Sequence, residues 1–378
     1  MKTGRTNSFI IVAFLLFFTT ITSISFAQDK QKSFTVNKGD KLDLSTRMGN
    51  ITIGTWDKNE VNVVVKNIIE EELNQLKMEQ SGSVVKVIFK GDDSDNIEFE
   101  VTIPSELNLD LATGGGNISL NGDLDGTIDV STAGGNISTK NINGKADIST
   151  AGGNITTGDI NNDADISTAG GDMKIGRVNG TADISTAGGN IKVGDVSGSA
   201  DISTAGGNIS VKNVGGNADV STAGGNISVQ IVSGSAEINT AGGNLSLSSA
   251  TGKVEANTAG GNIKLEDIHG FIDANTAGGN IYAELYPDGK NPSDLNTAGG
   301  NIELLVPSDA KATIIATFRV KRWYDGEELD HIKSDFKESS IKRNKEDREV
   351  EVTYVLNGGG STIELNTAMG DIEIRKLK

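Results

Sequence analysis

Eleven carboxylates recur at one fixed place in a repeated octapeptide of this 378-residue chain. The octapeptide runs acid, apolar residue, Ser/Asn/Ala, Thr, two small residues, Gly and Asn or Asp, as in residues 147–154. Its acids are Asp110, Asp129, Asp147, Asp165, Asp183, Asp201, Asp219, Glu237, Glu255, Asp273 and Asp294. Stacked carboxylates could attract divalent cations, because calcium binds through oxygen ligands.

The spacing of these acids decides how strong that chemistry can be. Unit charges ~4.8 Å apart repel by about 0.9 kcal/mol in water and about 3.5 kcal/mol at an effective dielectric constant of 20. Such a row should raise its own pKa values and hold counterions loosely. A calcium site needs roughly six to eight converging oxygens, and the octapeptide does not match the Gly-rich nonapeptide calcium repeat. A solvated acidic edge is therefore the simpler interpretation.

We accordingly expect at most weak, non-stoichiometric divalent binding. The candidate ligands are Asp129, Asp147, Asp165, Asp183, Asp201, Asp219, Glu237, Glu255 and Asp273. The residue that ends each octapeptide is expected to form a structural turn ladder, since stacked amides can hydrogen-bond from one repeat to the next. Its members are Asn136, Asn154, Asp172, Asn190, Asn208, Asn226, Asn244, Asn262 and Asn280. The threonines are expected to point inward as satisfied core hydroxyls.

Catalytic chemistry has little support in the sequence. The two histidines, His269 and His331, are far apart and neither lies in a nucleophile motif. The coils are near copies, so none stands out as a reaction centre, and we expect no catalytic residue and no cofactor. The cluster Lys321-Arg322-Trp323-Tyr324 could bind sugar or peptide through its aromatic rings, but packing in a terminal lid is the favoured interpretation.

The elements that must position these residues follow from the period. The octapeptide starts are separated by 19, then eight times 18, then 21 residues, and a fixed period of this length indicates a solenoid. Alternation in 182–186 places Ala182, Ile184 and Thr186 on the inner face. Gly188-Gly189 should turn the corner, since Gly takes positive φ without steric cost. The predicted fold is an all-β, single-stranded β-solenoid with coils of about 18 residues.

Three apolar anchors per coil, such as Ile184, Ile191 and Val196, favour a roughly triangular coil with three short strands. A flattened, two-sided coil is the alternative. The predicted organisation is a signal peptide at 1–27, a β-rich cap at 28–106, the array at 107–306 and a β-rich cap at 307–378. The second cap includes a final coil over 362–374, and each cap should cover an open sheet edge.

Composition and the N-terminal residues bear on location. Lys2 and Arg5 precede the apolar run 9–18, and Ser25-Phe26-Ala27 offers a cleavage site, so a cleaved secretory signal is favoured over a retained anchor. Loss of 1–27 would move the net charge from −17 to −19, because only two positive charges lie there. Such acidity argues against nucleic acid as a partner. With no cysteine, neither a disulfide nor a lipid anchor is expected.

Several motifs resemble a known family. Phe34-Thr35-Val36, Gly49-Asn50-Ile51-Thr52-Ile53 and Trp56-Asp57 look like its opening, and the Thr-Ala-Gly-Gly-Asn-Ile copies with 370–374 match its later part. The family is the bacterial "putative adhesin" family, also called DUF4097. The resemblance covers nearly the whole chain after the signal and implies an exported β-solenoid without assigned catalytic residues.

Together these observations predict a non-enzymatic scaffold or adhesin-like protein of the bacterial cell envelope. It would be secreted, periplasmic or displayed on the cell surface, with no membrane span after signal removal. Repeated strand faces suit many weak contacts with a polysaccharide or a protein. The alternatives are a carbohydrate-active β-helix enzyme, a lyase or hydrolase, and a weak divalent-cation-binding protein that uses the acidic row.

Overall fold

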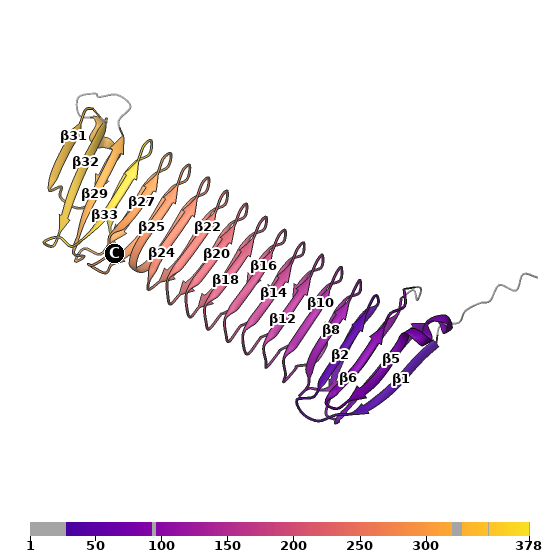
Figure 1. The fold of residues 1–378 in the computed structure, drawn as a ribbon. Helices are drawn as coiled ribbons and strands as arrows, with labels where there is room; N and C mark the ends of the chain where they lie inside the picture. The colour runs from indigo at the N-terminus through magenta and orange to yellow at the C-terminus, as the bar shows by residue number, and fades with distance from the viewer. Residues whose placement is uncertain (1–27, 93–95, 320–326, 347, 378) are drawn as a thin grey trace, which may run out of the picture.

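The computed structural model describes residues 28–92, 96–319, 327–346 and 348–377, which form a long, almost all-β rod (Figure 1). The predicted β-solenoid with β-rich ends is confirmed. The predicted signal peptide and the cluster at residues 321–324 lie outside the described residues. Within the described ranges, no helix has the length and apolar character that a membrane crossing requires.

Two sheets run the length of the rod, and each coil adds one strand to each. In the array, sheet B contains β8 (Asn108–Thr113), β10 (Ile128–Thr132), β12 (Ala146–Thr150), β14 (Ala164–Thr168), β16 (Ala182–Thr186), β18 (Ala200–Thr204), β20 (Ala218–Thr222), β22 (Ala236–Thr240), β24 (Lys253–Thr258) and β27 (Ser293–Thr297). Sheet A contains β9 (Ile118–Leu120), β11 (Ile137–Ser138), β13 (Ile155–Thr156), β15 (Met173–Ile175), β17 (Ile191–Val193), β19 (Ile209–Val214), β21 (Ile227–Val232), β23 (Leu245–Ala250), β26 (Ile281–Pro287) and β28 (Ile302–Val306). The long strand β25 (Ile263–Thr276) bends from sheet A into sheet B.

Neighbouring coils pair in parallel and in the register of the sequence repeat. Ile148 lies beside Ile166, and Asp147 lies beside Asp165. Because side chains alternate along a strand, this register stacks every inward residue on its equivalent. The anchors Ile184, Ile191 and Val196 are all buried, as the alternation predicts, and they belong to one continuous apolar core.

The third anchor does not form a third strand in the first coils of the array. It pairs through single-residue bridges that link Leu124, Ile142, Ile160, Val178, Val196 and Val214. From β19 onward the second and third anchors lie on one strand of sheet A, because Ile209 and Val214 both belong to it. The cross-section therefore has two sheets and a bridge ladder, where the favoured triangular interpretation expected three strands.

The reason expected for the glycine pair at the corner is wrong. Neither Gly188 nor Gly189 has a positive φ. Instead, a Cβ on Gly189 would overlap the carbonyl oxygen of Gly171 in the preceding coil, whereas one on Gly188 would lie an ordinary 3.4 Å from the Gly170 carbonyl oxygen. The second glycine is thus required by the close approach of stacked backbones.

At the N-terminal end, strands of one coil are interleaved between coils that come later in the sequence. The strands here are β1 (Gln28–Thr35), β2 (Lys41–Thr46), β3 (Asn50–Trp56), β4 (Glu60–Ile68), β5 (Leu76–Ser81), β6 (Val84–Phe89) and β7 (Glu98–Pro104), with the 3-10 helix η1 (Glu70–Gln75). β2 pairs with β6 on one side and β8 on the other. β3 likewise lies between β7 and β9. Residues 41–56 therefore form a solenoid coil of their own within the segment predicted as the N-terminal β-rich cap.

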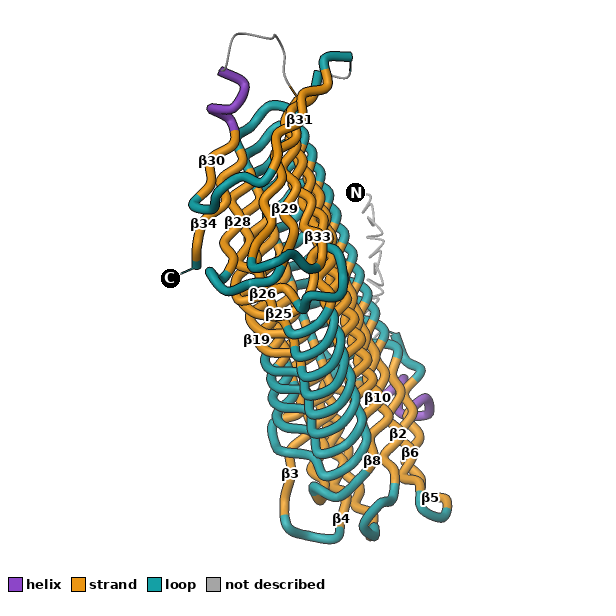
Figure 2. The backbone as a smooth tube through the Cα atoms, turned by 90° about the vertical axis from the view of Figure 1, so that its left-hand side faces the viewer, coloured by secondary structure: helices purple, strands orange, loops and turns teal. Residues whose placement is uncertain are grey.

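The C-terminal end repeats this arrangement in reverse order. Its strands are β29 (Ala312–Arg319), β30 (Ile332–Ser334), β31 (Ser340–Asn344), β32 (Glu349–Leu356), β33 (Ser361–Thr367) and β34 (Ile372–Lys376), with the 3-10 helix η2 (Glu327–His331). β33 lies between β27 and β29, and β34 lies between β28 and β30. Antiparallel strands finish both ends: β1, β4 and β5 at one, β31 and β32 at the other (Figures 1 and 2).

Candidate binding surface

The acidic row lies on the outward side of sheet B. Register pairs join Asp129 to Asp147 and Asp219 to Glu237, so the carboxylates of successive coils lie side by side. The row continues beyond the array to Asp43 at the N-terminal end and Glu364 at the C-terminal end. The structure thus places Asp129, Asp147, Asp165, Asp183, Asp201, Asp219, Glu237, Glu255 and Asp273 in one line.

Burial and mutual repulsion change the acidity of parts of this row. Partial burial, and then repulsion from Asp165 and Asp201, raise the pKa of Asp183. The same two causes raise the pKa of Asp129 and of Asp219. The carboxylates thus oppose their own ionisation.

One acid of the row departs from this trend. Glu255 has a lowered pKa, chiefly because Lys253 donates a hydrogen bond to it, at 2.7 Å between Nζ and Oε2. Within the described residues, no three acids or histidines are grouped as a metal site would require. A line of acids does not by itself provide the converging oxygens of a calcium site.

The turn ladder is a chain of side-chain to backbone hydrogen bonds. In each coil the backbone N–H of the turn residue donates to the side-chain oxygen of its equivalent one coil earlier, at 2.8 Å from Asn154 N to Asn136 Oδ1. Asp172 is not a gap, since its N–H donates to Asn154 Oδ1 and its own Oδ1 accepts from Asn190. The same bond recurs at Asn208, Asn226, Asn244, Asn262 and Asn280. These residues therefore have a structural reason to be present in every coil.

The inward threonines are buried and hydrogen-bonded. Thr204 Oγ1 donates to the Gly189 carbonyl oxygen of the preceding coil at 3.0 Å and accepts from Gly207 N at 3.3 Å. A buried hydroxyl without such partners would be costly, so the threonine fixes the corner of one coil on the corner of the next. The side chains of this row are therefore almost entirely buried, and their hydroxyls are used within the protein.

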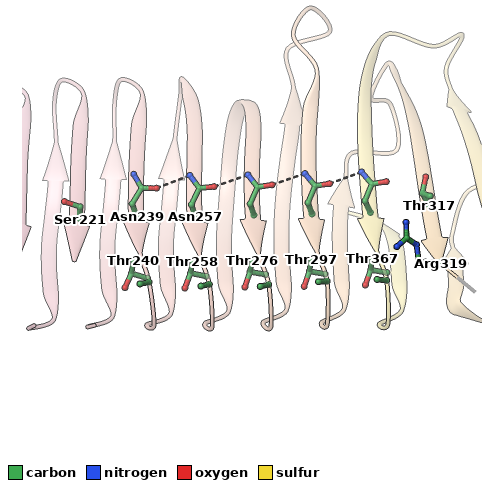
Figure 3. Close-up of a pocket in the computed structure, with 18 of the residues that line it drawn as sticks. Ser221, Asn239, Thr240, Asn257, Thr258, Thr276, Thr297, Thr317, Arg319 and Thr367 are labelled. Carbon is green, nitrogen blue, oxygen red and sulfur yellow. Dashed lines mark hydrogen bonds between the residues drawn. The ribbon is translucent and has the colours of Figure 1, made fainter. Parts of the chain in front are cut away.

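A second row of amides, which the sequence reasoning did not identify, lies two residues beyond the acids on the outward side of sheet B. Asn257 Nδ2 donates to Asn239 Oδ1 at 3.0 Å, and the chain of bonds continues through Asn275, Asn296 and Asn366 at 3.0, 2.9 and 2.8 Å (Figure 3). We call these five residues the amide row. The sequence signal was available, because Ser221 and its earlier equivalents give way to Asn from residue 239 onward.

The amide row also donates hydrogen bonds to the acids beside it. Asn239 Nδ2 donates to Glu237 Oε1 at 3.1 Å, and Asn275 Nδ2 donates to Asp273 Oδ1 at 2.7 Å. Both amide hydrogens of Asn275 are therefore used within the protein. The amide oxygens of Asn239, Asn257, Asn275 and Asn296 each accept one bond within the row as well. The acceptors left for a ligand are therefore the second lone pair of each amide oxygen and the carboxylate oxygens.

An open groove of about 1060 Å³ follows the amide row across consecutive coils. The amides and the threonine row line it (Figure 3). Exposed alanines of the corner, such as Ala259 and Ala277, also line it. At the C-terminal end it reaches Arg319, which forms an ion pair with Glu349 at 3.3 Å. The groove thus offers the same polar and apolar groups once per coil.

The two histidines take part in packing contacts. His331 Nδ1 lies 2.7 Å from Asp371 Oδ1, and its ring stacks on Phe318 at 4.2 Å between centroids. His269 stacks on Tyr286 at 4.3 Å and contacts Asp267 through Nε2 at 2.9 Å. The contacts of His331 with Asp371 and Phe318 join the C-terminal cap to the interleaved coil. Packing therefore explains the position of His331, and no catalytic role is needed.

The fold defines this molecule as a β-solenoid of stacked, two-sheeted coils. Residues 195–375 match the family described as Toastrack DUF4097. The family resemblance inferred from the sequence is therefore confirmed over residues 195–375. No curated protein matches the chain.

Several solved structures are similar in part. A "putative adhesin" from Bacteroides fragilis is 11% identical, with 93% of this chain and 97% of that chain covered and a TM-score of 0.24. A "putative adhesin" from Parabacteroides merdae is 14% identical over 66% of this chain and 96% of that one, with a TM-score of 0.31. A "putative lipid binding protein" from Parabacteroides distasonis is 14% identical over 93% and 97%, with a TM-score of 0.20.

Proposed function

We propose that this protein is an exported, non-enzymatic β-solenoid that serves as a scaffold or adhesin-like binding protein at the bacterial cell envelope. The observation that carries the proposal is the groove along the amide row, where each coil repeats the same outward groups. A partner with its own repeating units, a polysaccharide or an extended protein segment, would meet one equivalent contact per coil. Contacts that are weak singly become strong when several form on one rigid body.

The chemistry of the groove favours partners that donate hydrogen bonds. Amide and carboxylate oxygens of the two outward rows are acceptors, and Asn239 and Asn275 already donate within the protein. A polymer rich in hydroxyl or ammonium groups suits this surface, and the net charge of −17 disfavours a polyanion. Catalysis is not part of the proposal, because the coils repeat one another and hold no distinct reaction centre.

Binding by purified residues 28–378 to envelope polysaccharides and envelope proteins tests the proposal. The double variant Asn257→Leu, Asn275→Leu should weaken binding at least about tenfold, since several repeated contacts are lost at once. Ser167→Leu, Ser185→Leu changes the same outward row in earlier coils and should bind like the unmodified chain. Equal affinity of both variants would contradict the groove as the binding surface.

Two further measurements address the remaining parts of the proposal. Release of soluble sugar from any polysaccharide, abolished by one Asp-to-Asn change, would replace the scaffold by a carbohydrate-active enzyme. Protease treatment of intact cells should degrade the protein if it is displayed on the surface. Protection until the outer layers are permeabilised would place it inside the envelope.

A further inference from the structure

The outward side of sheet A has the opposite charge character to that of sheet B over the same coils. Lys174 and Lys192 are register partners on β15 and β17, and both side chains are exposed. Together with Lys212 and Arg177 they border a shallow depression of about 230 Å³. We call these four residues the basic patch.

Four cations and two carboxylates, those of Asp159 and Asp195, line the depression, so its charge is positive on balance. Arg177 has one carboxylate at 4.0 Å, that of Asp159. Among the described residues, no carboxylate oxygen lies within the same 4.0 Å of the ammonium groups of Lys174, Lys192 or Lys212. Gly176 and Gly194, which have no side chain, form part of the lining of the depression.

The two acids near the patch are engaged with other groups. Asp159 Oδ1 accepts from the backbone N–H of Arg177 at 2.8 Å, and Asp195 Oδ1 accepts from Asn213 Nδ2 at 2.7 Å. These bonds hold the carboxylates at the backbone of sheet A. The ammonium groups of Lys174 and Lys192 are left facing solvent.

The acidic row on sheet B is the counterpart. From Asp129 to Asp219 the row carries one carboxylate per coil, and within the described residues none of these six acids has a cationic group within 4.0 Å. The two sheets lie on opposite sides of the core (Figure 2). One molecule therefore presents cations on one side and anions on the other over the same stretch of rod.

We propose that molecules of this protein associate side by side, with the basic patch of one copy against the aspartate row of the next. Lys174 and Lys192 are register partners on neighbouring strands, so they have the same spacing as the aspartates, about 4.8 Å, and two ion pairs can form in one register. The contact joins two different surfaces, so a pair of molecules leaves one surface of each kind free, and further copies can be added. This association goes beyond the proposed binding function and does not depend on it.

A second copy is favoured over a polyanion or an anionic membrane as the occupant of the basic patch. The net charge of −17 repels a polyanion as a whole, and the patch holds only four cations. The aspartate row is opposite to the patch in charge and has the same spacing between coils. Repulsion inside the aspartate row would be relieved by the cations of a neighbouring molecule.

Sedimentation of purified residues 28–378 at low and high ionic strength tests the inference. We expect assemblies larger than a monomer at low salt and monomers at ~1 M salt, where the Debye length is about 3 Å. Lys174→Glu, Lys192→Glu and, separately, Asp183→Lys, Asp201→Lys should each remain monomeric at low salt. An equimolar mixture of these two variants should associate again, because the reversed faces complement each other.

The control Lys90→Glu, Lys311→Glu changes the net charge equally at exposed positions outside the patch and should assemble like the unmodified chain. Monomers under all conditions would overturn the inference, as would assembly of the reversed variants alone or no recovery in the mixture. A final experiment measures binding of the chain to vesicles that contain anionic lipid. Vesicle binding that is lost in Lys174→Glu, Lys192→Glu, by a chain that stays monomeric, would assign the patch to a membrane.

Discussion

The corner column and the outward face of sheet A differ sharply in how much they vary along the rod. We define the corner column as residues 186–190 and their equivalents, where Thr, the second Gly and the turn Asn or Asp recur in every coil of the array. The corresponding outward position of sheet A changes from Thr156 through Lys174 and Ser210 to Tyr282. The corner column contacts its own copies in the next coil through backbone and side-chain hydrogen bonds, whereas the outward position faces solvent.

This contrast separates two kinds of repetition. A residue that packs between stacked backbones can be replaced only if its neighbours in both directions allow it. A residue that faces outward is not held in this way. The acids of sheet B still recur in every coil, but other outward positions change, as at the basic patch and the amide row. Outward positions that depart from the repeat are therefore a better guide to binding surfaces than the repeated corner positions, which are explained by stacking.

The largest expected effect lies within the corner column itself. Gly189→Ala should lower the free energy of unfolding by roughly 2–4 kcal/mol, because the new methyl group overlaps the Gly171 carbonyl oxygen and forces the coils apart. Gly188→Ala should stay within about 0.5 kcal/mol of the unmodified chain. The chain already contains a change of this second kind, since Met369 stands at the position equivalent to Gly188 and is 58% exposed. Urea unfolding followed by circular dichroism measures both, and equal effects would refute the close-approach argument.

The threonine hydrogen bonds should have the next largest effect. Thr204→Val keeps the shape but leaves the Gly189 carbonyl oxygen and the Gly207 N–H without this partner, so we expect a loss of about 1–3 kcal/mol. Ser203→Val changes the neighbouring outward residue and should alter stability by no more than about 0.5 kcal/mol. Similar losses in both variants would mean that the corner hydroxyls contribute no more than an ordinary surface group.

A smaller effect of opposite sign is expected in the acidic row. Asp183→Asn should raise stability at neutral pH by roughly 0.5–1 kcal/mol at low salt, because it removes repulsion from Asp165 and Asp201. The folded pKa of Asp183 is raised, so its ionisation costs stability as the pH rises from its unfolded value, about 3.9, through the folded value. The advantage of the variant should therefore disappear below about pH 3.9.

Asp163 provides the matched control for this pH dependence. Its pKa is lowered, first by the backbone hydrogen bond from Thr181 and then by the Thr181 hydroxyl. Asp163→Ala should therefore destabilise the protein at neutral pH, and the difference should fade as the pH falls through the folded pKa of Asp163. Thermal melts between pH 3 and pH 7 measure both variants, and the same pH trend in the two would contradict the assignment.

The smallest effect concerns metal ions. We expect millimolar calcium to raise the free energy of unfolding by less than about 0.5 kcal/mol, as for a ligand near its dissociation constant. Calorimetry should show no stoichiometric site, in keeping with the absence of grouped ligands among the described residues. Saturable binding that is lost in Asp183→Asn, Asp201→Asn would contradict this expectation, and a complete lack of shift would remove even the weak interaction.

Much of the architecture could be predicted from the repeat, because register and burial follow directly from its period and alternation. Ile184 and Ile191 were placed correctly for this reason. The interleaved ends could not be predicted, since the pairing of β2 with β6 and of β33 with β29 depends on contacts between degenerate, distant segments. The role of Gly189 was also out of reach, because the distance between stacked backbones is a property of the assembled coils. The amide row, by contrast, could have been predicted from the sequence, because Ser221 is replaced by Asn at position 239 and in the later coils.

The interleaved ends have a consequence for how the rod is completed during synthesis. β27 and β29 are consecutive strands of sheet B in the chain, yet each pairs with β33, which is translated only after both. A nascent chain that has emerged only to residue 356 holds the outermost strands of its C-terminal cap without the strand that joins them to the rod. The strand that joins the C-terminal cap to the rod is therefore one of the last segments of the chain to be synthesised. At the N-terminal end the order is reversed. The first coil, residues 41–56, is synthesised early and gains its neighbours on both sides only when residues 84–120 follow.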